Sequence, residues 1–94
     1  MEITKIYWRE DALNNLKDII ALYHRHGRKV AGKIIDDITK DIETMRKRPY
    51  LGYIEASMMG QPQKIFSHYI TSRQIKVLYY TENDTMYIID FWDN

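Results

Sequence analysis

The sequence predicts a single α+β domain, in which a helical hairpin packs on one face of a small antiparallel sheet. Three observations predict it: a strand-like start, two helical patterns separated by one glycine, and three β-type runs near the C-terminus. The order is β-α-α-β-β-β. A chain of 94 residues is long enough for one compact domain and too short for two, so residues 1–94 are treated as one unit.

The composition restricts the class of protein. Hydrophobic residues make up 45% of the chain and charged residues 29%, which supports a core and argues against disorder. Without cysteine, neither a disulfide framework nor a thiolate metal site can form, which fits a reducing cytoplasm. No apolar stretch approaches the roughly 20 residues of a membrane span, and no signal-peptide pattern is present. A net charge of +1 means that any nucleic-acid binding must depend on local clusters of basic residues.

The chain begins with a predicted strand and a predicted helix. Residues 3–8 alternate in the manner of a strand, with Ile6 and Trp8 on one side. Residues 11–26 carry apolar side chains at steps of three and four, which predicts an amphipathic helix. Gly27 can adopt the left-handed conformation that stops a helix.

A second, longer helix is predicted over residues 28–48. Pro49 ends it, because proline disfavours helical geometry in the preceding residue. With only Gly27 between them, the two helices should form an antiparallel hairpin. Residues 50–63 hold two glycines and a proline and are predicted to be an ordered loop.

The last third of the chain is predicted to form a three-stranded antiparallel meander. The strands are expected at residues 64–70, 73–81 and 85–92, with a polar turn at 82–84. Short turns make them antiparallel neighbours. The helical hairpin should cover one face of this sheet, and the other face is then available to a partner.

Several local patterns follow one another in a fixed order along the chain. They are Ile6-Tyr7-Trp8, Glu10-Asp11-Ala12, Leu16, Ile19, Ile20, Ile38, Ile42, Pro49-Tyr50-Leu51-Gly52, Ile75-Lys76-Val77-Leu78-Tyr79 and Asp84-Thr85-Met86-Tyr87-Ile88-Ile89. This ordered set resembles the RelE/ParE superfamily of bacterial toxins from type II toxin–antitoxin modules. The stretch from Pro49 to Gly52 is similar to the family's proline-x-x-glycine exit from the second helix.

The resemblance implies a cytoplasmic toxin that inhibits growth through a macromolecular target. A cognate antitoxin encoded beside it would neutralise it by covering the open face of the sheet. One branch of the family cleaves messenger RNA on the ribosome, and the other inhibits DNA gyrase and is not an enzyme. Both targets stay open, as does a toxin that has lost its activity and acts only as an interaction module. A homodimer and a toxin–antitoxin hetero-oligomer are both compatible with the family.

Two departures from the family pattern count against the nuclease branch. The arginine of the family's middle strand is Lys76 here, and lysine lacks the planar fork that grips phosphate. The final strand is followed by Asp93, which would repel a phosphate. The proline-x-x-glycine exit favours the gyrase-type branch.

Five residues are candidates for binding or catalysis of RNA. Lys64, Arg73 and Lys76 can form a cationic patch for RNA phosphate or for acidic residues of an antitoxin, or they can be a solvated strand edge. His68 titrates near neutral pH and can exchange protons, or it is structural. Tyr80 can stack on a base, although packing is the more common role of tyrosine. In a nuclease, Lys64 and Lys76 would hold phosphate while His68 or Tyr80 moved protons.

The last strand adds two further candidates for binding. Asp90 and Trp92 fall on the same side of the strand, and Asp90 is expected to act as a base or to pair with Lys76. No metal or cofactor is predicted. His24 and His26 are two positions apart on a helix and therefore point in different directions, unlike metal ligands at helical spacing.

Overall fold

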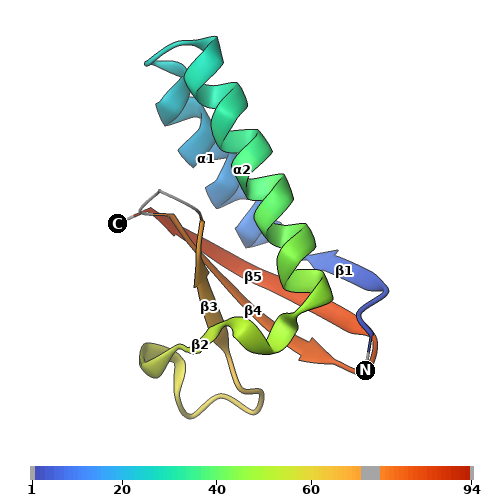
Figure 1. Cartoon of the computed structure of the whole chain (residues 1–94). Helices are drawn as coiled ribbons and strands as arrows, with labels where there is room; N and C mark the ends of the chain where they lie inside the picture. The colour runs from blue at the N-terminus through green and yellow to red at the C-terminus, as the bar shows by residue number, and fades with distance from the viewer. Residues whose placement is uncertain (1, 71–74, 94) are drawn as a thin grey trace.

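A computed structural model describes residues 2–70 and 75–93 of the chain. It has an α+β architecture in which two helices lie on one face of a five-stranded mixed sheet (Figure 1). In chain order, the elements are β1 (Lys5–Trp8), α1 (Glu10–His24), α2 (Arg28–Lys47), a 3-10 turn η1 (Pro49–Leu51), β2 (Tyr53–Ile54), a second 3-10 turn η2 (Ala56–Met58), β3 (Phe66–Tyr69), β4 (Ile75–Glu82) and β5 (Thr85–Asp93).

The sheet is larger than the predicted three-stranded antiparallel meander. Its strand order is β1-β5-β4-β3-β2, with β1 parallel to β5 and the other neighbours antiparallel. The meander of β3, β4 and β5 is confirmed as its centre, and the predicted first strand is present as β1. The prediction of a three-stranded antiparallel sheet was wrong, because β1 and β2 extend the meander to five strands and β1 is parallel to β5. β1 and β5, the first and last strands, are neighbours in the sheet. They can meet because the helical hairpin that follows β1 leads the chain across the sheet. β2 lies in the segment 50–63 that was predicted to be loop, and its two residues are too short to give a periodic pattern.

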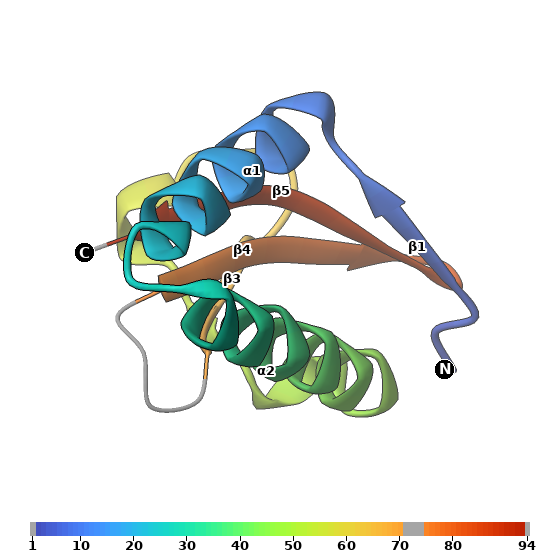
Figure 2. The ribbon, with the colours of Figure 1, turned by 90° about the horizontal axis from the view of Figure 1, so that it is seen from above.

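The two predicted helices are confirmed, with ends within two residues of those expected. Glu10 and Asp11 occupy the first turn of α1, where negative charge favours the helix dipole. Gly27 has a φ of 110°, a value that side chains rarely tolerate, and this conformation reverses the chain between the helices. From that turn the helices diverge, so β4 and β5 are visible between them (Figure 2). Neither of these helices is long and apolar enough to cross a membrane.

The main core lies between the helices and the sheet. β4 alternates strictly here, because Ile75, Val77 and Tyr79 point to the helices and are completely buried. The other members of this core come from every large element: Ile3, Ala12, Ile19, Ile34, Ile38, Ile42, Met45, Ile70, Met86, Ile88 and Phe91.

A second, smaller core lies on the opposite face of the sheet, which we call the second face. It consists of Ile65, Leu78 and Ile89, against which Met58 packs. Residues 55–65 form a loop over this face, closed at its base by a hydrogen bond from Glu55 N to Ile65 O of 2.8 Å. We call residues 55–65 the covering loop. The prediction of an open second face is therefore correct only in part, because the chain covers its centre.

A β-bulge in β5 determines which of its side chains join the main core and which join the second core. Leu78 pairs with Asp90 and Tyr79 with Ile88, which leaves Ile89 as the extra residue. The extra residue allows Ile88 and Phe91 to join the main core while Ile89 joins the second. The bulge also changes the face of the sheet to which the Asp90 side chain belongs.

Candidate functional site

A lysine between two aromatic rings marks one end of the second face. Tyr69, Lys76 and Trp92 are direct neighbours on β3, β4 and β5. The Lys76 Nζ lies 4.7 Å from the centre of the Trp92 ring and 5.8 Å from that of Tyr69. Both distances are within the range in which an ammonium group is attracted to an aromatic ring. The three strands therefore form a preorganised site around a cation.

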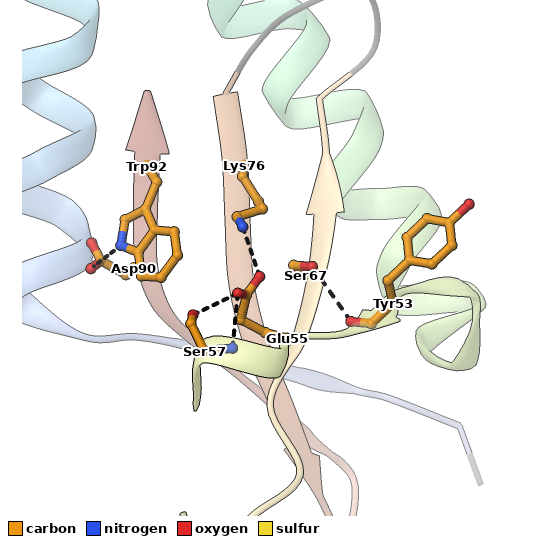
Figure 3. A network of polar contacts seen from close by, with 7 residues as sticks. All are labelled: Tyr53, Glu55, Ser57, Ser67, Lys76, Asp90 and Trp92. Atoms are coloured by element: carbon orange, nitrogen blue, oxygen red, sulfur yellow. Dashed lines mark hydrogen bonds and ion pairs between the residues drawn. The ribbon is translucent and has the colours of Figure 1, made fainter. Parts of the chain in front are cut away.

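The charge of Lys76 is balanced by an acid from the covering loop. Its Nζ donates to Glu55 Oε1 at 2.7 Å, and Ser57 Oγ donates to Glu55 Oε2 at 2.6 Å (Figure 3). The Lys76 bond, followed by the Ser57 bond, lowers the pKa of Glu55 from 4.5 to about 2. The two charged side chains are only 13% and 11% exposed. Lys76 thus holds the loop in place, and its charge is already neutralised within the chain.

Asp90 has other partners than the expected Lys76. Trp92 Nε1 donates to Asp90 Oδ2 at 2.8 Å, and Asn15 Nδ2 from α1 donates to Oδ1 at 2.6 Å. The carboxylate therefore joins a helix to the indole that faces Lys76 (Figure 3). These bonds orient the Trp92 ring.

A row of three tyrosines crosses the other end of the second face. Tyr7, Tyr87 and Tyr80 are direct neighbours on β1, β5 and β4. The Tyr80 and Tyr87 rings stack at 4.7 Å with a tilt of 12°, and Tyr7 lies 5.7 Å from Tyr87 at 52°. Burial, followed by the neighbouring Tyr87, raises the pKa of Tyr80, so its hydroxyl stays protonated at neutral pH.

A cleft of about 610 Å³ lies between this tyrosine row and the covering loop. Its size is in the range of ligand-binding sites in proteins. It is lined by Tyr7, Arg9, Met58, Gln61, Pro62, Gln63, Ile65, Tyr80, Tyr87 and Ile89.

The structure separates the residues proposed for RNA cleavage. His68 lies on the helix side of the sheet, with Nε2 3.6 Å from Asp41 Oδ2 of α2, whereas Lys76 and Tyr80 lie on the second face. Lys64 is exposed and lines a hollow within the covering loop. Arg73 lies outside the described residues. Of the predicted set, the structure brings together Lys76, Trp92 and Asp90.

Sequence reasoning missed the acid that neutralises Lys76. Glu55 lies 21 positions away in a segment predicted to be loop, and no pattern connects the two residues. The tyrosine row was also missed. The strand order makes Tyr7, Tyr80 and Tyr87 neighbours, and the bulge at Ile89 places Tyr87 on the same face as Trp92, which strict alternation along the strand would not do.

A second candidate surface is an apolar groove between the diverging helices and β1. It has a volume of about 390 Å³ and lies open to solvent. Ile35 is 41% exposed here, although it is a large aliphatic side chain. The groove is lined by Ile6, Trp8, Leu16, Ile20, Ile35, Ile38, Thr39, Ile42 and Glu43. A cluster of this kind is typical of a surface that another protein covers.

Comparison with known proteins shows the fold. No protein-family model matches the chain, and no curated protein matches its sequence. Among solved structures, the chain is similar to one from "Chromosomal ParDE TA system from P. aeruginosa", with a TM-score of 0.75. The match covers 95% of this chain and 94% of that chain at 16% sequence identity. The chain therefore shares its fold with this chain of a ParDE system.

Proposed function

We propose that this chain is the toxin of a type II toxin–antitoxin module, which inhibits growth by binding a macromolecular target and is neutralised by a cognate antitoxin. The observation that carries the proposal is the match over 95% of the chain to a protein of a ParDE toxin–antitoxin system. Fold alone does not determine function, so the surfaces of this chain must support the same conclusion.

The second face supports a toxin that acts by binding and does not cleave RNA. Cleavage of a phosphodiester requires a cation that is free to stabilise charge in the transition state, beside groups that move protons. Lys76 instead pairs with Glu55 at 2.7 Å, and His68 lies on the opposite face. We therefore infer the gyrase-inhibiting type of activity, with no enzymatic step.

The apolar groove supports a tightly bound protein partner. An amphipathic helix with aliphatic residues at helical spacing fits a groove whose walls are two helices and a strand. Docking there would cover Ile20 and Ile35, which an isolated domain leaves in contact with water. We assign this groove to the antitoxin, in place of the second face that the sequence suggested.

Controlled expression in bacteria tests the proposal. We expect induction of the chain alone to stop growth and to cause DNA breaks, with the total RNA pool intact. Coexpression with the antitoxin gene that we expect beside its own should restore growth. In vitro, the purified chain should inhibit DNA supercoiling by gyrase, and the same chain premixed with the product of the neighbouring gene should not.

Three results would contradict this proposal in different ways. Normal growth on induction would reject toxicity and favour a domain that only binds a partner. Fragmented messenger RNA with intact DNA would reject the binding mechanism in favour of cleavage. Arrested growth with gyrase fully active would reject this target but leave the toxin assignment standing.

A further inference from the structure

We propose that the cleft beside the tyrosine row binds an extended segment of a partner protein that carries an acidic side chain for Arg9. This inference goes beyond the proposed function, because it concerns a surface to which that proposal gives no ligand. It depends only on the cleft of about 610 Å³ between β1, β5, β4 and the covering loop. It holds whether or not the chain is a toxin.

The lining of the cleft suits an extended peptide. Met58 is partly exposed and provides an apolar contact for a side chain, above the buried Ile65 and Ile89. Gln61 and Gln63 each carry an amide that can both donate and accept hydrogen bonds, as the backbone of an extended peptide requires. Grooves lined by aromatic rings are a common means of binding extended segments.

Arg9 determines the charge of the expected segment. Its side chain is exposed, lines the cleft, and makes no ion pair with any residue in 2–70 or 75–93. The Lys76 charge on the same face is already neutralised by Glu55. A guanidinium binds a carboxylate through two parallel hydrogen bonds, which gives both affinity and direction. An aspartate or glutamate of the partner is therefore the complement of this cleft.

The same geometry argues against single-stranded nucleic acid. Bases bind by stacking on free aromatic faces, but Tyr80 and Tyr87 stack on each other at 4.7 Å, so one face of each ring is already covered. A nucleic-acid strand also needs a series of cations along its backbone, and the cleft lining provides Arg9 alone.

The test is selection of short random peptides, displayed on phage, against the purified chain and its Arg9→Glu variant. We expect the wild type to select extended sequences with a fixed acidic position and the variant to lose that preference. A synthetic peptide of the selected sequence should then bind Arg9→Ala roughly tenfold more weakly, the value of one charge-assisted hydrogen-bonding group. Fluorescence anisotropy measures this binding. Arg28→Ala is the matched control, since Arg28 is also an exposed arginine but lies outside the cleft lining.

A second variant tests whether the peptide binds in the cleft. Tyr7 is 57% exposed, so Tyr7→Ala should fold normally, which thermal melting checks. The variant should nevertheless bind the selected peptide more weakly. Selection without an acidic position, or equal binding by Arg9→Glu, would overturn the proposal. Displacement of the peptide by oligouridylate that itself depends on Arg9 would also overturn it, in favour of a nucleic-acid site. None of these results concerns growth or gyrase, so the function proposed above is tested separately.

Discussion

At the scale of single residues, Gly52 and Tyr79 explain the proline-x-x-glycine exit from α2. Tyr79 is completely buried, and its hydroxyl donates to Pro49 O at 2.8 Å. Burial raises its pKa, so the phenol keeps the proton that it donates. A Cβ at position 52 would lie 2.2 Å from that hydroxyl. Position 52 requires glycine because a side chain there would not fit beside Tyr79. Its φ of −71° is open to any residue and therefore does not explain the glycine.

This contact gives a first prediction. Gly52→Ala should destabilise the chain by about 2 kcal/mol, because the new methyl group must displace a buried hydroxyl. Tyr79→Phe should cost about 1 kcal/mol through the lost hydrogen bond to Pro49. The double variant should lose less than the sum, since removing the hydroxyl relieves the clash. Urea denaturation measures all three variants, and strict additivity would contradict the assigned contact.

A second prediction concerns the ion pair between Glu55 and Lys76. Glu55→Gln should reduce the free energy of unfolding by about 1–2 kcal/mol at pH 7, between the values for exposed and for buried pairs. The folded-state pKa of Glu55 is about 2 and its ordinary value is 4.5, so the folded state favours the charged form. This contribution is therefore complete above about pH 4.5 and is lost as the pH falls towards 2.

The measurement is denaturation of wild type and variant at a series of pH values. The difference between them should shrink between pH 4.5 and pH 2. Glu43→Gln is the control, because Glu43 also pairs with a cation, Arg46, but on the exposed surface of α2. A constant difference over this pH range would show that the pair does not hold the covering loop.

At the scale of secondary-structure elements, the divergence of α1 and α2 creates the apolar groove. Had the helices packed along their whole length, their aliphatic stripes would have covered each other. The helices instead diverge from the turn at Gly27 (Figure 2). Ile20 and Ile35 therefore line an open groove beside β1. The same divergence makes room for a helix from a partner.

A third prediction concerns the proposed antitoxin. Ile35→Asp should leave the fold intact, because the side chain is 41% exposed, and should weaken the complex with that proposed partner at least about tenfold. Calorimetry with the purified proteins measures the affinity. Leu22→Asp is the matched control, since Leu22 is 48% exposed on α1 and lies outside the groove lining. Equal loss in both variants would mean that the antitoxin binds elsewhere.

At the scale of the whole molecule, the order β1-β5-β4-β3-β2 gives the strands very different protection from solvent. β4 and β5 each have a neighbour on both sides and contribute to both cores. β2 is a two-residue edge strand whose side chains Tyr53 and Ile54 are 75% and 55% exposed. Edge strands with exposed backbone groups open most easily.

Amide hydrogen exchange tests this difference. We expect Ile88 and Val77 to exchange only through global unfolding and the amides of β2 to exchange through local opening. β1 should be intermediate, because it is also an edge strand but pairs with β5 over four residues, whereas β2 pairs with β3 over two. Equal protection of β2 and β5 would contradict the strand order as the source of stability.

Local sequence was sufficient for the helices and the three central strands, because periodicity of apolar residues is a property of neighbouring positions. The same holds for the turn at Gly27 and the end of α2 before Pro49. Among the site residues, the alternation of β5 placed Asp90 and Trp92 on one side, and they do form a hydrogen bond.

What the tertiary structure alone decided are the contacts between distant segments. The pairing of Lys5 with Thr85, the bond from Lys76 to Glu55 and the placement of His68 on the opposite face all depend on how the elements meet. A periodic pattern identifies the face of an element and carries no information on which partner lies across from it. The sequence by itself therefore determined the two helices, the first strand and the three meander strands. β2, the bulge in β5, the strand order, the neutralised lysine and the two candidate surfaces followed only from packing.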